Sequence, residues 1–301
     1  MIKDKKIFCI FGMTINSYKK GFTLVELLVV IAIVGLLSAI VLVVTSGLGS
    51  QANLAKTLAW SRSINSLLGA SSIGFWNFDE NPAVHGTVIQ DLSGWGNNGT
   101  LSTGDGSTNK STTGVINNAL IFDGINDFIN LSSYIAVSSG NPWTVELWFR
   151  PTTIAWRRLL CPGSGYHELS SRSDGKFMYR WTGGDEWKDF VMAVPYTAGE
   201  WYHVVFVANA SGYENKINVY GNGKSSTTGW SIIPSGGGTG LNIKQIADDD
   251  YIFNGLIDEV HIYSQALTAS QIQSRYYAGL DRLLAKGLIG EQEYQEHLLK
   301  I

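Results

Sequence analysis

The chain of 301 residues is 45% hydrophobic and 16% charged, so a sizeable core is available for one large domain or two medium ones. Its formal net charge of −3 gives no support for nucleic acid as a partner, because polyanions bind basic surfaces. The two cysteines, Cys9 and Cys161, and the scattered histidines predict neither a disulfide framework nor a zinc site.

An uncharged apolar stretch runs from Leu27 to Val44 and is long enough to cross a bilayer as a helix. The basic segment before it, residues 3–20, is expected to stay on the cytoplasmic side. An ordinary signal peptide has its cleavage site after the apolar run, whereas here the distinctive residues precede it. The sequence therefore predicts a single-pass precursor in the cytoplasmic (inner) membrane, with the rest of the chain outside.

The stretch from Lys19 to Leu27, KKGFTLVEL, resembles the processing site of type IV prepilins. The resemblance implies that prepilin peptidase cuts after Gly21 and that Phe22 becomes the N-methylated first residue. It also implies that Glu26, an expensive acid inside an apolar segment, pairs with the N-terminal ammonium of a neighbouring pilin subunit during assembly. The alternative is a plain signal anchor with Glu26 near the membrane interface.

Apolar residues recur at helical spacing from Ala52 to Leu68, and Gly69 with the serines after it ends the pattern. We therefore expect one long N-terminal helix over residues 22–71, with its membrane-spanning part at about 22–45. The leader before it covers residues 1–21, and the start at Met1 or Met13 stays open.

Residues 73–266 change to short alternating runs separated by Gly, Asn, Asp and Ser. Within Thr144–Arg150, Val145, Leu147 and Phe149 share one face of a predicted strand. Further strands are predicted at 201–208, 217–220 and 256–263, with a hairpin turn at 221–224. Many short strands with such turns predict a mainly β fold, an antiparallel jelly-roll β-sandwich.

Several segments of this region resemble, in order and spacing, the laminin-G-like or concanavalin A-like jelly rolls of lectins and glucanases. These segments are Trp76–Glu80, Asp91–Gly99, Ala119–Gly124, Thr144–Pro151, Trp201–Val204, Asn222–Lys224 and Gly255–Val260. The resemblance implies two curved antiparallel sheets, often with a structural Ca²⁺ ion and often with carbohydrate binding.

Three aspartates are predicted ligands for that ion, because hard oxygen ligands suit Ca²⁺. Asp258 shares strand parity with apolar residues of the run 256–263, so it is expected to face the apolar side, where a carboxylate must be paired or metal-bound. Asp91 and Asp123 lie in polar, turn-like segments. The alternative for these two is that they cap tight turns.

A glycan-binding site is predicted at Trp181, Asp185 and Trp187, where aromatic and polar residues alternate. Trp156, with the arginines at 157–158, is another candidate. The alternative is that these rings pack within the sandwich or at strand edges.

Catalysis is not expected, and no catalytic residue is assigned. Glucanases of this architecture carry acids on one strand face in a Glu-x-Asp-x-x-Glu type pattern, which does not occur here. Asp258 and Glu259 are adjacent and so are expected to point to opposite faces.

The domain organisation predicted is a leader (1–21), a pilin N-terminal helix (22–71), a jelly roll (72–267) and a C-terminal helical hairpin (268–301). A capping box at Thr268–Gln271 begins the hairpin. We expect a minor pilin or pseudopilin that displays a non-catalytic head, binding a glycan or another surface ligand, in a pilus or pseudopilus at the cell surface. The alternatives are a type II secretion pseudopilin with a structural or cargo-contacting head and, less favoured, a membrane-tethered glycoside hydrolase. Removal of the leader leaves a net charge of about −7, which disfavours DNA uptake.

Overall fold

The computed structural model describes residues 24–34, 68–106, 108–162, 168–180, 187–191, 195–211, 214–229, 231–232, 240–247 and 251–299. The chain divides into two compact units, Met1–Asn53 and Leu54–Ile301. In the first unit, residues 24–34 form a helix with exposed side chains, and Glu26 lies on it. Gly21, Phe22 and residues 35–67 of the predicted helix lie outside the described residues. No helix in the described part of the chain combines the length and the apolar character that crossing a bilayer requires.

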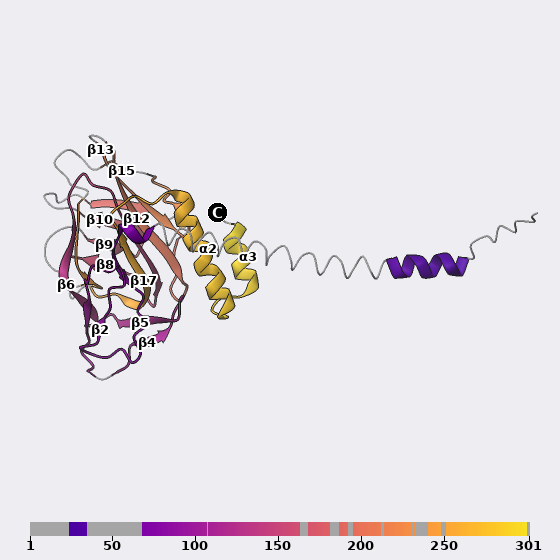
Figure 1. The fold of residues 1–301 in the computed structure, drawn as a ribbon, viewed down its shortest axis with the longest axis horizontal. Helices are drawn as coiled ribbons and strands as arrows, with labels where there is room; N and C mark the ends of the chain where they lie inside the picture. The colour runs from indigo at the N-terminus through magenta and orange to yellow at the C-terminus, as the bar shows by residue number, and fades with distance from the viewer. Residues whose placement is uncertain are drawn as a thin grey trace, which may run out of the picture. The chain divides into compact units, whose positions relative to one another are not determined.

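The second unit is a sandwich of two antiparallel sheets (Figure 1), which confirms the mainly β prediction. Its described strands are β1 (Ser72–Trp76), β2 (Val88–Ile89), β3 (Gly99–Ser102), β4 (Ser111–Thr113), β5 (Asn118–Asp123), β6 (Phe128–Val137), β7 (Trp143–Pro151), β8 (Arg157–Cys161), β9 (Leu169–Ser171), β10 (Lys176–Arg180), β11 (Trp187–Val191), β12 (Tyr202–Ser211), β13 (Glu214–Gly221), β14 (Lys224–Ser225), β15 (Ser231–Ile232), β16 (Leu241–Ile246) and β17 (Asn254–Tyr263). Among the described residues, a nine-stranded sheet has the order β14-β13-β12-β7-β17-β5-β4, with β1 paired to β17 and β15 to β13. The eight-stranded sheet has the order β11-β10-β9-β8-β16-β6-β3-β2.

The main core lies between the two sheets and is built by strand alternation. Val145, Leu147 and Phe149 of β7 are fully buried in it, as their shared parity predicts. Cys161, at the end of β8, is a buried thiol whose Sγ lies 3.5 Å from Oε1 of Gln245. The fold therefore depends on apolar packing between the sheets.

The predicted hairpin turn at 221–224 joins β13 to β14. Its two central residues, Asn222 and Gly223, have φ of 50° and 78°. Positive φ at both centres is what the tight hairpin turn requires, and Asn-Gly supplies it at low cost. The hairpin turn that the sequence predicts at 221–224 is therefore confirmed, because it depends on the local conformational preferences of Asn222 and Gly223.

The prediction that Asp258 faces the same side as Val260 and Ile262 is wrong, because β17 has a β-bulge. The register of β17 on β7 shifts between Asp258 and His261, and Glu259 there has φ of 51°. Ile257, Val260 and Ile262 therefore lie in the main core, whereas Asp258 lies on the outer face of the nine-stranded sheet. Asp258 is nevertheless fully buried.

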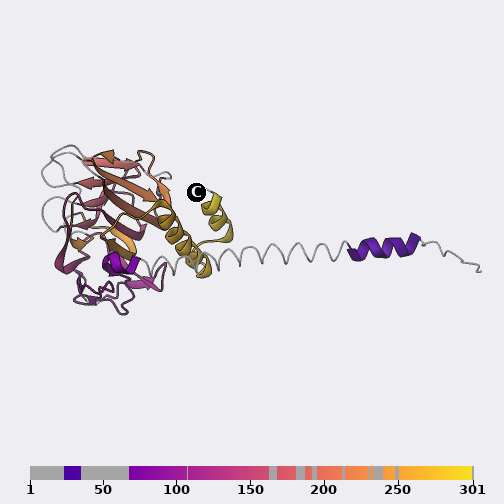
Figure 2. The ribbon, with the colours of Figure 1, turned by 45° about the horizontal axis from the view of Figure 1, so that its top comes forward.

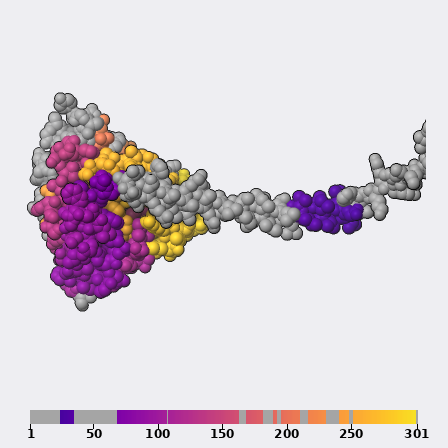
Figure 3. Space-filling model, viewed as in Figure 1, coloured from indigo at the N-terminus to yellow at the C-terminus, as the bar shows by residue number. Residues whose placement is uncertain are grey.

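Two helices, α2 (Ala269–Ala285) and α3 (Glu291–Leu299), follow the last strand, so the prediction of two C-terminal helices is confirmed. The capping box of Thr268 and Gln271 begins α2, and Gly287, with φ of 66°, follows its C-terminal end. Both helices lie outside the sandwich (Figures 1 and 2), and their yellow surface lies at one side of it in Figure 3. Buried residues of α2 pack on Trp148 of β7, so α2 covers the outer face of the nine-stranded sheet.

Candidate functional site

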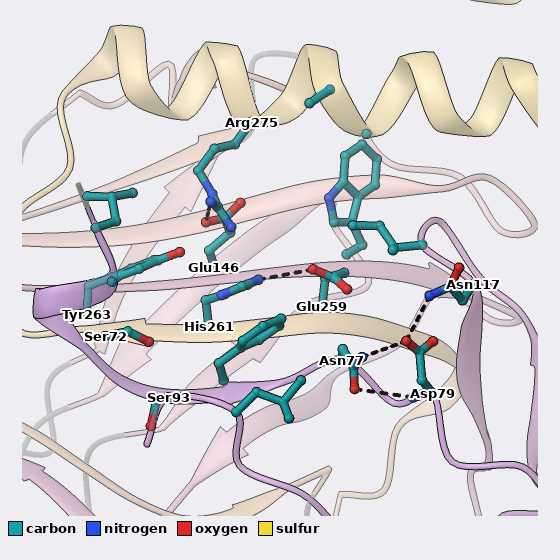
Figure 4. Close-up of a pocket in the computed structure, with 18 of the residues that line it drawn as sticks. Ser72, Asn77, Asp79, Ser93, Asn117, Glu146, Glu259, His261, Tyr263 and Arg275 are labelled. Carbon is teal, nitrogen blue, oxygen red and sulfur yellow. Dashed lines mark hydrogen bonds and ion pairs between the residues drawn. The ribbon is translucent and has the colours of Figure 1, made fainter. Parts of the chain in front are cut away.

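A pocket of about 400 Å³ lies between α2 and the outer face of the nine-stranded sheet (Figure 4). We call it the α2 pocket. Phe75 and Trp148 contribute aromatic rings to its lining. Its polar lining side chains come from β1 and the loops near it, β7, β17 and α2, and they are Ser72, Asn77, Asp79, Ser93, Asn117, Glu146, Glu259, His261, Tyr263, Arg275 and Arg282.

A buried ion pair joins α2 to the sheet within the pocket. Nε of Arg275 lies 2.5 Å from Oε2 of Glu146, and Nε2 of His203 lies 2.8 Å from the other oxygen of that carboxylate. Burial acts to raise the pKa of Glu146, but the charge of Arg275 and the hydrogen bond from His203 outweigh it and lower the pKa to about 2. Glu146 is therefore ionised at neutral pH, and its negative charge neutralises the positive charge of Arg275.

Next to this ion pair, β17 presents His261 and Glu259 toward the pocket. Nε2 of His261 lies 3.2 Å from Oε2 of Glu259, and Phe75 stacks on the imidazole with ring centroids 4.0 Å apart. Burial and the nearby charge of Arg275 lower the pKa of His261, so the imidazole is neutral at neutral pH. Glu259, only 8% exposed, thus has an uncharged partner.

At the other end of the pocket, Asp79 organises two amide side chains. Its Oδ2 accepts hydrogen bonds from Nδ2 of Asn77 at 2.6 Å and from Nδ2 of Asn117 at 2.9 Å. Its Oδ1 accepts from the backbone N–H of Asn118 at 3.0 Å. The carboxylate therefore fixes the amides of two loops at the pocket wall, where they can recognise a polar ligand.

Asp91 and Asp123, two of the predicted Ca²⁺ ligands, cap loops. Asp91 accepts hydrogen bonds from the backbone N–H groups of Phe75, Ser93 and Asn97 at 2.8–3.0 Å. Oδ1 of Asp123 accepts from two backbone N–H groups of the turn after β5, those of residues 125 and 126. Both contacts are of the turn-capping kind that was the alternative to ion binding.

Asp258, the third predicted ligand, lies beneath α2. Its Oδ2 accepts a hydrogen bond from the backbone N–H of Ile116 at 3.0 Å, whereas its buried Oδ1 has no hydrogen-bond partner. Burial and the adjacent charge of Glu259 raise its pKa well above the ordinary value, so we expect a protonated carboxyl. In the described part of the chain, no three His, Cys, Asp or Glu residues form a group suited to a metal ion. Ca²⁺ binding stays a prediction, since calcium sites also use backbone carbonyls.

The predicted glycan-binding residues fall largely outside the described residues. Trp181, Asp185 and the side chain of Trp187 are among these, although the backbone of Trp187 begins β11. The other candidate, Trp156, is 37% exposed and stacks on Tyr251 with ring centroids 4.9 Å apart. Trp156 therefore belongs to a surface aromatic pair and lies away from the α2 pocket.

A second, more polar pocket of about 300 Å³ lies between α3 and the loop before β12. Glu293 of α3 and Glu200 of the loop both line it. Burial, followed by the charge of Glu200 and a hydrogen bond to it, raises the pKa of Glu293. The carboxylates of Glu200 and Glu293 therefore repel each other when both are ionised.

The sequence did not predict the principal residues of the α2 pocket. Glu146 and Arg275 are 129 residues apart, so no local spacing relates them. The available signal was that Glu146 is the one acid in the apolar run TVELWFR, opposite in parity to Val145 and Leu147. A charge in such a run indicates that the outer face of the strand has a charged partner.

Two families match the chain. The family described as "Concanavalin A-like lectin/glucanases superfamily" matches residues 122–273, and the "Prokaryotic N-terminal methylation motif" matches residues 16–42. No curated protein matches the chain.

Solved structures share the fold of the head. Domain 4 of AbnA, a GH43 extracellular arabinanase from Geobacillus stearothermophilus, in complex with arabinotriose, is 25% identical with a TM-score of 0.51, covering 67% of this chain and 97% of that one. The binding domain of Paraclostridial Mosquitocidal Protein 1 is 16% identical with a TM-score of 0.52, covering 71% of this chain and 53% of that one. The second likeness concerns the fold alone.

Proposed function

Because the chain belongs to the concanavalin A-like lectin/glucanase superfamily and carries an N-terminal methylation motif, we propose that it is a pilin-like subunit with a non-catalytic, carbohydrate-binding head. Prepilin peptidase cuts after Gly21, Phe22 is methylated, and Glu26 pairs with a neighbouring subunit. The precursor spans the cytoplasmic membrane with its N-terminal helix, which then packs in a filament at the cell surface.

The observation that carries the binding half of the proposal is the α2 pocket. Sugars present hydroxyl groups that donate and accept hydrogen bonds, and C–H faces that pack on aromatic rings. The pocket combines oriented amides and carboxylates with the rings of Phe75 and Trp148, within about 400 Å³. The arabinotriose bound to domain 4 of AbnA supports a sugar as the class of ligand.

The binding half is tested on a glycan array with the full-length protein in a polyoxyethylene detergent, which contains no sugar. Asp79→Ala frees the amides of Asn77 and Asn117, and we expect about a 10-fold or larger loss of affinity for any glycan bound. Asp174→Ala removes an exposed acid of the β9–β10 turn and is the matched control. Binding that Asp79→Ala leaves unchanged would contradict this site.

The same array in Ca²⁺ and in EDTA tests the proposed ion. Loss of binding in EDTA supports Ca²⁺ at Asp91, Asp123 or Asp258, and equal binding in both conditions contradicts a role for Ca²⁺ in recognition.

The pilin half is tested by mass spectrometry of the mature N-terminus, which we expect to begin at N-methylated Phe22. Glu26→Ala is expected to be processed normally but to be lost from filaments.

A further inference from the structure

The buried carboxylates of the head are nearly all neutralised within the fold. In the described part of the chain, three of them lie within 4 Å of a cationic side chain: Glu146 with Arg275 at 2.5 Å, Glu168 with Arg158 at 2.7 Å, and Asp127 with Lys110 at 2.8 Å. Asp91 is satisfied by three backbone N–H groups, and Asp258 has one such bond and is expected to be protonated. These arrangements are what burial of an acid requires.

Glu259 is the exception. It is 8% exposed, and its hydrogen bond goes to the neutral imidazole of His261. Two arginines, Arg275 and Arg282, line the pocket, and Arg275 is already paired with Glu146. Lys286, beyond Asp258, donates to the backbone carbonyls of Gly114 and Asn117. Among the residues that the structure describes, no ion pair joins Glu259 to a lysine or an arginine.

The backbone directs Glu259 into the α2 pocket at some cost. Positive φ is unfavourable for a residue with a side chain, and here it coincides with a β-bulge, which redirects side chains out of the regular alternation. Glu259 lies between His261 and the Asn77–Asp79 pair, facing the same space (Figure 4). Strained residues of this kind concentrate at binding sites.

The other groups of the pocket favour a ligand with a positive charge. The lining contains three acids, Asp79, Glu146 and Glu259, against two bases, Arg275 and Arg282. Phe75, Trp148 and Tyr263 add aromatic rings, whose faces attract cations and pack on apolar ring surfaces. A bare metal ion would use neither the rings nor a volume of about 400 Å³.

We propose that the α2 pocket recognises an amino sugar, a sugar unit with an unacetylated primary amine whose ammonium group pairs with Glu259. This inference rests on the proposed carbohydrate-binding function and specifies in addition that the sugar ligand carries a positive charge. The ammonium would donate to the Glu259 carboxylate, while Asp79, Asn77 and Asn117 would take ring hydroxyls. N-acetylation of the same sugar removes both the charge and the fit to Glu259.

The test is isothermal titration of the full-length protein, in the same sugar-free detergent, with glucosamine, N-acetylglucosamine, glucose and ethanolamine. We expect glucosamine to bind about 10-fold or more tightly than glucose or N-acetylglucosamine, as a charge-assisted hydrogen bond predicts. Glu259→Gln should abolish that preference while leaving residual binding of neutral sugars. Glu200→Gln, an exposed acid of the second pocket, is the matched control and should keep the preference.

The outcomes separate this inference from the proposed function. Equal affinity for glucosamine and glucose, or a preference that survives in Glu259→Gln, overturns the amine inference and leaves a carbohydrate-binding head. Binding of ethanolamine with no advantage for glucosamine overturns the sugar and retains a cation site. Failure of all four ligands overturns the amine inference, whereas the proposed carbohydrate-binding function fails only if the glycan array also shows no binding. The comparison of ligands on the wild-type protein decides the matter even where Glu259→Gln does not fold.

Discussion

The two faces of the nine-stranded sheet are both buried, but by opposite means. Toward the eight-stranded sheet, β7 presents Val145, Leu147 and Phe149, which pack against other apolar side chains. Toward α2, the same strand presents Glu146 and Trp148, and the cover includes an ion pair and a pocket. Apolar packing stabilises a fold directly, whereas buried charges recover little more than their desolvation cost. The outer layer is therefore expected to contribute less to stability than the apolar layer between the two sheets.

The largest effect is expected from the inner face. Leu147→Ala removes a fully buried side chain from the main core and should lower the free energy of unfolding by about 2–5 kcal/mol. Chemical denaturation of the full-length protein in detergent measures this loss. A loss below about 1 kcal/mol would show that the two sheets do not depend on close packing at β7.

On the outer face of the same strand, Glu146 is next to Leu147. Here a single substitution that breaks the ion pair should lower the free energy of unfolding more than a double substitution that removes both charges. Arg275→Met leaves Glu146 buried with only His203 as a partner, and we expect a loss of about 3 kcal/mol. Combining it with Glu146→Leu removes both charges and should restore most of the stability. A double variant as unstable as Arg275→Met alone would contradict this explanation, because the loss would then not come from the unpaired charge of Glu146.

The seam between α2 and the sheet gives a smaller effect. A Cβ added at Gly279 would lie 2.1 Å from the ring of Trp148, closer than any real contact. Gly279→Ala should therefore displace α2 and lower the free energy of unfolding by about 1–3 kcal/mol, despite the better helix propensity of alanine. Ala285→Gly, at an exposed position at the end of α2, is the control for helix propensity. Equal stability of Gly279→Ala and wild type would contradict the close approach.

The smallest effect concerns α3 and its pH dependence. The raised pKa of Glu293 means that the folded state holds its proton more tightly than the unfolded state, whose pKa is 4.5. The docking of α3 should therefore be strongest below that pH and weaken as pH rises through the raised folded value. Glu293→Gln should protect the α3 amides from hydrogen exchange better than wild type at pH 7 and equally at pH 4. Glu291→Gln, in the first turn of α3, should have the opposite sign, because an acid there is favourable to the helix dipole. Identical exchange of Glu293→Gln and wild type at pH 7 would contradict repulsion from Glu200.

Features set by neighbours in the sequence were predictable. The strand at Val145–Phe149, the Asn222–Gly223 turn and the capping box at Thr268 depend on alternation, positive φ and side-chain hydrogen bonds within a few residues. The lectin-like fold and the methylation motif followed from segments whose order along the chain is specific.

Features that depend on distant contacts were not predictable. The bulge at Glu259 reverses the parity of β17, and nothing in LIDEVHIY marks which residue is extra. The partnership of Glu146 with Arg275 needs the placement of a helix that follows 129 residues later. The α2 pocket is the product of both, so its residues emerged from the structure alone.

Cys161 gives the head a built-in reporter of its own opening. In the proposed mature chain, which lacks the leader with Cys9, it would be the single thiol, and the sandwich buries it on β8. Because the thiol is buried, a thiol reagent is expected to react with it only when the structure around β8 opens. The rate at which a thiol reagent labels the intact protein would therefore measure how often this part of the fold opens, without a mutation or an attached dye.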